Sequence, residues 1–318
     1  MKFLDLKYDA FGLDINDLSV KVAKLEKKQG KFSLVSYGET AIRPGIVEGG
    51  IIKNEKTLAN AIETACENAK IKSKYAVFSL PEEGSFLQVI QLPKMEKEEL
   101  KSAVVFEAEN YIPLPMDQVY LDFQIIEPIK DVLDHLDVLI VATPKKIVDP
   151  YVSCIKSGGL IPLAAEVESQ AMVRALIKNE TSETPLALID AEKNNVEFIV
   201  FSGRAIRFTY SIPISLSIQS LNELVAEIKK YIEFYQEHAS HEHLPSPEKR
   251  IRKIILLGGG ADLRGFPELI SKKLGVLAEF GDPFLNLPLA KRKGSRFPAL
   301  SFITTLGLAA GGINFQND

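Results

Sequence analysis

The sequence is poor in cysteine, nearly balanced in charge, and has no apolar segment close to its N-terminus. Cys66 and Cys154 are the only cysteines, too few for a disulfide framework, which favours a reducing cytoplasm. A formal net charge of −4 over 318 residues gives no sign of a nucleic-acid-binding protein. The first residues place acids where a secretory signal peptide needs an apolar core, so we expect no secretion signal.

One uncharged stretch, residues 297–315, approaches the ~20 residues of a membrane-spanning helix. Pro298, Gly307, Gly311 and Gly312 lie within it, together with several hydroxyl side chains, so its mean hydropathy is low. We therefore expect a small-residue helix that is buried between lobes.

The chain reads as two halves that begin alike. A chain of 318 residues is long enough for two domains or one large bilobed domain. Each half opens with a predicted β-hairpin whose first strand ends in an aspartate, Asp14 or Asp190. The polar stretch 179–184 predicts the hinge, which gives a first lobe at 1–180 and a second at 181–318. We also expect a β-α-β-β-α insertion at about 84–159 and a small helical subdomain at about 216–250.

Hydrophobic periodicity and turn residues set the other predicted elements. Asn54 is a predicted N-cap for the first helix. Helices are expected over 55–68, 96–111, 145–156, 168–178, 221–237 and 266–274. Strands are expected over 32–40, 75–80, 86–92, 119–126, 136–142, 160–167, 186–189, 196–201, 204–212, 253–257 and 276–280.

The opening hairpin, residues 10–25, carries the first candidate site. Asn16 begins a predicted turn, Asp14 ends the strand before it, and Ser19 and Lys21 begin the strand after it. An acid, backbone N–H groups and a hydroxyl at a hairpin tip are one way to hold a nucleotide's phosphates and its metal. The alternative is that these side chains only close the turn.

A glycine-rich turn, Gly258, Gly259 and Gly260, follows the buried strand at 253–257. Any side chain there would keep a base or ribose away from the backbone. Glu227 and Lys230 lie on one side of the helix at 221–237, opposite its apolar stripe, where ordinary surface charges are the alternative.

These pieces resemble the actin-like ATPase superfamily and, within it, the PilM family of type IV pilus assembly proteins, which is related to FtsA. The second of the stretches that carry the resemblance is the most specific. They are GLDINDLSVKVAKL at 12–25, EAENYIPLPMDQVYLDFQII at 107–126, ELVAEIKKYIEFY at 223–235, LGGGADLRGFPE at 257–268 and TTLGLAAGG at 304–312.

The resemblance implies an α/β fold of the actin-like (ribonuclease H-like) type, with two lobes, duplicated β-meander/α domains and an inserted subdomain. It implies an ATP site in the interlobe cleft, with Mg²⁺ at Asp14 and Asp190 if nucleotide binds. The implied nucleotide-binding residues are Asp14, Asn16, Ser19, Lys21, Asp190, Glu227, Lys230, Gly258, Gly259 and Gly260.

The resemblance also implies a cytoplasmic adaptor, held at the inner face of the cytoplasmic membrane by its partner. That partner is the N-terminal tail of a PilN-like inner-membrane protein, bound between the first-lobe core and the insertion. Tyr111, Ile112, Leu114 and Met116 are the candidate groove residues, with core packing as their alternative. Other platform proteins, motor ATPases and self-association are further implied contacts, and nucleic acid is not.

The sequence departs from an ATPase at both hairpins. Asp17 adds a negative charge near the phosphates, and Ala191 and Glu192 stand where a glycine and small residues are expected. No catalytic residue can be assigned, although Glu166 and Glu168 lie in the plausible region. We therefore expect weak or absent hydrolysis. The alternatives are an active ATPase or kinase of the superfamily, or an FtsA-like filament protein.

Overall fold

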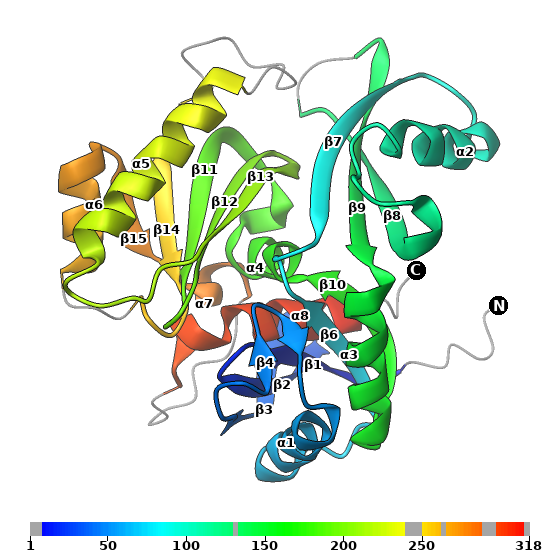
Figure 1. Cartoon of the computed structure of the whole chain (residues 1–318), viewed down its shortest axis with the longest axis vertical. Coiled ribbons are helices and arrows are strands. Elements are labelled where there is room, and N and C mark those ends of the chain that lie inside the picture. Colours follow the sequence, from blue (N-terminus) through cyan, green and yellow to red (C-terminus); the bar gives the residue numbers. More distant parts are fainter. Residues whose placement is uncertain (1–7, 130–132, 239–249, 262–264, 288–296, 315–318) are drawn as a thin grey trace. The chain divides into compact units, whose positions relative to one another are not determined.

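The computed structural model describes residues 8–129, 133–238, 250–261, 265–287 and 297–314 (Figure 1). The chain divides into two compact units. The first comprises the chain up to Glu83, Lys145–Ile177 and the chain from Asp282 onward. The second comprises Gly84–Pro144 and Lys178–Gly281.

The first unit contains a five-stranded sheet in the order β10-β6-β1-β2-β3. The first three strands in sequence form an antiparallel meander, and two later strands add to it in parallel. These strands are β1 (Ala10–Ile15), β2 (Ser19–Lys28), β3 (Lys31–Ala41), β6 (Tyr75–Leu80) and β10 (Ile161–Val167). A short ribbon pairs β4 (Val47–Glu48) with β5 (Ile51–Ile52).

Helices cover this sheet. α1 (Glu55–Asn68) begins where predicted, because the Asn54 side chain accepts a hydrogen bond from the Thr57 N–H. α1 packs against β3 and against α3 (Lys145–Ser157). α8 (Ile303–Asn314) packs against β1, β2 and β6, and against α4 (Glu168–Leu176). α7 (Pro283–Asn286) also contacts α4.

The second unit repeats this strand pattern in the order β13-β12-β11-β14-β15. An antiparallel meander is again extended by two parallel strands, so the two halves are duplicates in topology. The strands are β11 (Ser182–Ala191), β12 (Val196–Gly203), β13 (Ala205–Ile212), β14 (Lys253–Leu257) and β15 (Leu277–Phe280). The apolar stripe of α5 (Leu221–His238) and residues of α6 (Phe266–Leu274) complete one buried core with this sheet.

A third, antiparallel sheet in the order β7-β9-β8 belongs to the second unit. Its strands are β7 (Phe86–Pro93), β8 (Val119–Ile126) and β9 (His135–Pro144), and α2 (Lys97–Ala108) covers one face. Val89, Ile126 and Leu139 of this sheet form a separate small apolar cluster with Ala205 of β13. This apolar contact joins the inserted sheet to the second sheet within one unit.

Two segments lie elsewhere than the sequence indicated. We predicted that the insertion runs to about residue 159, but α3 packs on α1 in the first unit, and the compact boundary falls at Pro144. We predicted a buried small-residue helix between lobes. α8 is buried and rich in small residues, but its contacts with β1, β2, β6 and α4 place it inside the first unit. No helix in the described ranges is long and apolar enough to cross a membrane.

Candidate functional site

A row of polar residues crosses the first sheet at the end of β1. Asp14 is opposite Lys21 on β2, and Lys21 is opposite Glu39 on β3. On the other side, Asp14 Oδ1 accepts a hydrogen bond of 2.9 Å from Ser79 Oγ, and Ser79 pairs with Glu166 on β10. Asp14, Lys21 and Ser79 are buried. The predicted residues Asp14 and Lys21 are thus neighbours on one face of the sheet.

The tip of this hairpin is closed by its own side chain. Asn16 Oδ1 accepts hydrogen bonds from the N–H groups of Leu18 (3.1 Å) and Ser19 (2.8 Å). The Asn16 N–H in turn donates to the Ser19 carbonyl. The Ser19 hydroxyl lies 3.3 Å from Asn16 Oδ1. Asn16 and Ser19 therefore lie together at the tip as expected, and their N–H groups are engaged within the turn.

Asp17 binds a neighbouring loop. Its carboxylate accepts hydrogen bonds from the N–H groups of Gly49 (2.8 Å) and Gly50 (3.2 Å). Gly50 has a φ of +70°, and a Cβ there would lie 2.3 Å from Pro81 Cβ, so only glycine fits. Asp17, which we expected to add a negative charge near phosphates, thus has a structural role in holding this loop.

Tyr151 lies beneath this loop among acidic side chains. Its hydroxyl donates to the Gly50 carbonyl at 2.9 Å. Burial, followed by the charges of Glu168 and Asp17, raises the pKa of Tyr151 well above its ordinary value. This side chain therefore stays protonated and keeps donating its hydrogen bond.

The two acids that sequence reasoning placed in the catalytic region differ in their surroundings. Glu166 is buried and forms an ion pair with Arg174. Arg174 also donates to the Gly307 carbonyl at 3.2 Å, which joins α4 to α8. Glu168 is the first residue of α4. In the first turn of this helix, the N–H and the hydroxyl of Ser169 donate hydrogen bonds to the Glu82 carboxylate. Glu166 therefore belongs to a buried structural pair.

In the second unit, a second carboxylate stands beside the aspartate at the hairpin. Asp190 is opposite Glu197 on β12, and both are buried. Glu197 accepts hydrogen bonds from Asn195 Nδ2 (2.6 Å) and Ser211 Oγ (2.7 Å). Two adjacent carboxylates repel a phosphate unless a cation lies between them.

The glycine-rich turn packs against this same hairpin. Gly258 has a φ of +92°, and a Cβ there would lie 2.3 Å from Asp190 Oδ1. The Gly260 N–H donates to the Ala191 carbonyl at 2.7 Å. The Gly259 N–H lies 3.3 Å from Glu192 Oε1. The predicted residues Asp190 and Gly258–Gly260 are therefore brought together. The close packing of this turn on the hairpin requires glycine at Gly258 and Gly260.

Glu227 and Lys230 pair with each other on α5. Lys230 Nζ lies 3.2 Å from Glu227 Oε2 and 5.1 Å from the centre of the Tyr231 ring. Their role towards a nucleotide stays a prediction.

The four candidate groove residues differ in exposure. Ile112 is buried in the core of the inserted sheet, and Leu114 and Met116 pack partly against it, whereas Tyr111 is 45% exposed. Sequence reasoning missed Phe106, which is 73% exposed on α2. Phe106 falls outside the apolar stripe of that helix, and an aromatic residue in that position was the signal that could have found it.

Residues 12–211, more than half of the chain, match the family described as type IV pilus assembly protein PilM. The chain belongs to the PilM family. The stretch 107–126, on which the resemblance most depended, lies inside the matched range, and the stretches from 223 onward lie beyond it.

Solved structures confirm the actin-like fold of this PilM-family chain. A chain from a PilM–PilN type IV pilus biogenesis complex superposes with a TM-score of 0.81 at 22% identity, covering 96% of this chain and 99% of that one. The ethanolamine utilization protein EutJ from Carboxydothermus hydrogenoformans gives 0.51 at 12%, covering 94% and 88%. A Bacteroides thetaiotaomicron protein with an actin-like ATPase fold gives 0.50 at 10%, covering 98% of each chain.

The predicted Mg²⁺ ligands of this PilM-family chain, Asp14 and Asp190, belong to different units. In the part of the chain that the structure describes, no three His, Cys, Asp or Glu side chains are placed to hold a metal ion. At the tip of the first hairpin, the N–H groups of Leu18 and Ser19 already donate to Asn16 Oδ1, so they are engaged within the turn.

Proposed function

We propose that this chain is an adaptor in type IV pilus assembly, which binds the cytoplasmic tail of a PilN-like membrane protein through its inserted subdomain, residues 84–144. Membership of the PilM family supports the assembly role. The structural neighbour named as a PilM–PilN complex supports the choice of partner. The chain would then be held at the inner face of the cytoplasmic membrane by that tail.

The observation that carries the proposal is a concentration of exposed apolar side chains. Five of the fifteen exposed large apolar side chains in the described residues fall between residues 105 and 125. They are Val105, Phe106, Tyr111, Tyr120 and Ile125. Exposed aromatic residues of this kind are typical anchors of protein interfaces.

Charge favours the same partner. Residues 84–144 contain four lysines and no arginine against six glutamates and five aspartates, a net charge of −7. Since the whole chain carries −4, the remainder is positive. Cytoplasmic segments next to a membrane helix are rich in lysine and arginine, so such a tail complements an acidic, partly apolar surface.

Backbone geometry adds a docking mode. β8 lies at an edge of the inserted sheet. An extended tail can pair with an edge strand through main-chain hydrogen bonds, while side chains give specificity. Tyr120 and Ile125, both exposed on β8, would then contact the bound tail.

The test is a binding titration with a labelled synthetic peptide that copies the N-terminal cytoplasmic residues of the PilN-like protein. We expect Phe106→Ala and Tyr111→Ala each to weaken binding by about tenfold, or about 1.4 kcal/mol. Ile218→Ala is the matched control, because Ile218 is 75% exposed elsewhere in the same unit. Equal affinity of all three variants and the parent would reject the inserted subdomain as the docking surface.

We further propose that ATP hydrolysis is weak or absent. The engaged N–H groups of the first hairpin and the paired carboxylates Asp190 and Glu197 support this view. ATP with Mg²⁺ remains a candidate ligand. Calorimetric titration with Mg-ATP, repeated with Asp14→Ala and Asp190→Ala, tests it. Binding that both variants abolish would establish nucleotide as a ligand, and a magnesium-dependent ATPase rate lost in Asp14→Ala would contradict weak hydrolysis.

A further inference from the structure

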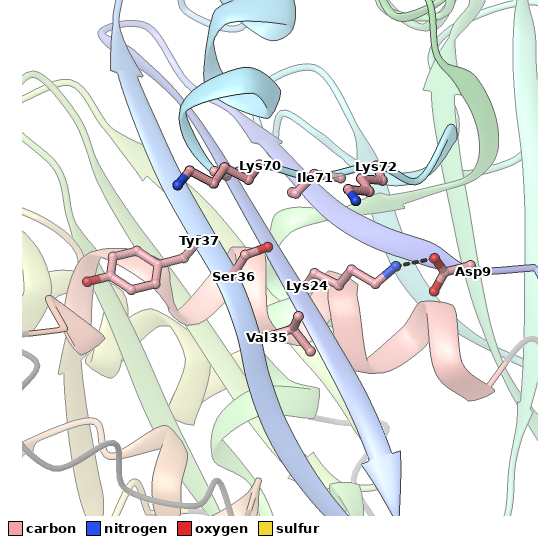
Figure 2. Close-up of a pocket in the computed structure, with 9 residues that line it drawn as sticks. Asp9, Lys24, Val35, Ser36, Tyr37, Lys70, Ile71 and Lys72 are labelled. Atoms are coloured by element: carbon pink, nitrogen blue, oxygen red, sulfur yellow. Dashed lines mark ion pairs between the residues drawn. The ribbon is translucent and has the colours of Figure 1, made fainter.

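A pocket of about 620 Å³ opens in the first unit (Figure 2), and none of its lining residues belongs to the turn at either hairpin tip. Its walls come from β2, from residues 35–37 of β3, and from residues 69–72 after α1. None of its lining residues belongs to the predicted nucleotide-binding or partner-binding sets.

Cations dominate the lining. Lys24, Lys70 and Lys72 line the pocket, and Asp9 is the one acid among the lining residues. Figure 2 shows Lys70 and Lys72 on the segment after α1, across from Lys24, whose ammonium group points to Asp9. The Lys24 side chain is only 11% exposed, whereas Asp9 is 72% exposed. A buried cation is thus held in place by an acid that remains accessible to solvent.

Lys70 occupies a backbone position that suits glycine. Its φ is +55°, the left-handed region. It lies two residues after Asn68, the last residue of α1, and the Ile71 N–H that follows it donates to the Cys66 carbonyl at 3.0 Å. Glycine is the residue that helices most often use there, because a Cβ in this conformation costs free energy. An outlier of this kind points to a function for the side chain.

The surrounding sequence strengthens the positive field. The segments 24–31 and 70–74, which supply the three lysines, hold Lys27, Lys28, Lys31 and Lys74 as well. Glu26 is their only acid. A concentration of one charge beside a pocket attracts ligands of the opposite charge.

We propose that this pocket binds the phosphate group of an organic phosphate. Lysine ammonium groups bind phosphate as point charges, and the Ser36 hydroxyl in the lining adds a donor. Val35 and Ile71 supply an apolar wall for the organic part of the ligand. The phosphate comes either from an anionic lipid headgroup or from a free phosphorylated compound.

Two probes distinguish these sources at an ionic strength of about 0.1 M, where weak surface attraction is screened. The first is pyrophosphate in a calorimetric titration. The second is co-sedimentation with vesicles of phosphatidylcholine containing phosphatidylglycerol, against vesicles of phosphatidylcholine alone. Binding of pyrophosphate without vesicles assigns a soluble ligand, and retention on the anionic vesicles assigns a lipid headgroup.

The variants separate binding from folding. Lys70→Gly removes the cation and relieves the backbone, so we expect an unchanged or raised unfolding midpoint together with at least fivefold weaker binding. Lys72→Gln should weaken binding similarly. Lys56→Gln is the matched control, because it removes an equal charge from an exposed lysine near the start of α1.

Binding of either probe that falls in Lys70→Gly and Lys72→Gln, and is kept in Lys56→Gln, supports the pocket. The proposal is overturned if neither probe binds, if the two pocket variants bind as the parent does, or if Lys56→Gln loses as much affinity as they do.

Discussion

Lys21 and Glu197 occupy equivalent positions in the two sheets and carry opposite charges. Lys21 is opposite Asp14 on the first hairpin, and Glu197 is opposite Asp190 on the second. Lys21 and Glu197 are 176 residues apart, as are Asp14 and Asp190. The duplication therefore keeps the aspartate and reverses the charge beside it. At this position, a cation lies opposite the aspartate in the first hairpin and a carboxylate lies opposite it in the second.

Removal of the Lys21 charge should destabilise the first unit. Asp14 and Lys21 are 4% and 3% exposed, and a buried charge that loses its neighbour costs about 3 kcal/mol. We expect that loss for Lys21→Met in urea unfolding. The double variant with Asp14→Asn should recover part of it, because no buried carboxylate remains. Additive losses in the double variant would show that the two side chains are not coupled.

Asp17 should affect stability rather than ligand binding. Asp17→Ala leaves the N–H groups of Gly49 and Gly50 without the carboxylate that accepts their hydrogen bonds. We expect a loss of about 1–2 kcal/mol in the free energy of unfolding, with Asp17→Asn intermediate. Denaturant titration measures it. Unchanged stability together with tighter Mg-ATP binding would instead assign Asp17 an electrostatic role.

Substitution of Gly258 by alanine should destabilise the protein far more than the same substitution of a glycine that has no close neighbours. Gly258→Ala combines a positive φ with a Cβ 2.3 Å from Asp190 Oδ1, so we expect a loss of more than about 3 kcal/mol or failure to fold. Gly30 has a φ of +77° with nothing within 4 Å. Gly30→Ala should therefore cost only about 1 kcal/mol for the backbone conformation. Similar losses in both variants would mean that the turn moves freely away from the hairpin.

The two cysteines should make stability fall at alkaline pH. Burial raises the pKa of both thiols from 9.0 to about 12. The folded state keeps these protons while the unfolded state releases them, so stability is full below pH 9 and declines between pH 9 and 12. Each thiol contributes about 1.4 kcal/mol per pH unit to that decline.

Comparison of urea unfolding at pH 8 and pH 10.5 for the parent and for the Cys66→Ala/Cys154→Ala variant measures this contribution. The variant should have the shallower decline. Both thiols of the parent should also resist a disulfide reagent until the protein unfolds. Equal pH dependence of the two proteins would exclude the thiols as its source.

Local signals predicted the elements well. The helix at 55–68 has the predicted bounds because Asn54 caps it and its apolar residues follow the helical period. The strand at 75–80 was equally clear as a short apolar run. The resemblance also gave the family and the actin-like fold.

Contacts between residues far apart in the chain could not be predicted from local sequence patterns. The bonds from Asp17 to Gly49 and Gly50 span more than thirty residues, and nothing in the hairpin sequence indicates them. The packing of α3 on α1 likewise depends on tertiary contacts. Phe106 was missed because periodicity identifies the buried face of α2 and is silent about its exposed face.

Two glycines of α8, Gly307 and Gly312, differ in how closely the neighbouring elements pack against them. A Cβ on Gly307 would lie 1.9 Å from the Ala171 carbonyl oxygen of α4, whereas one on Gly312 would meet only side chains, at 3.1 Å and 3.2 Å. Alanine in a helix gains about 1 kcal/mol over glycine at either position. Gly307→Ala should nevertheless lose more than about 2 kcal/mol, because two backbones must separate.

Gly312→Ala should remain within about 1 kcal/mol of the parent. Thermal and urea unfolding of the two single variants measure the difference. Since Arg174 also donates to the Gly307 carbonyl, the Gly307→Ala variant should disturb the Glu166–Arg174 pair as well. Equal stability of both variants would mean that α8 can shift on the sheet, and that its small residues are not required for its position.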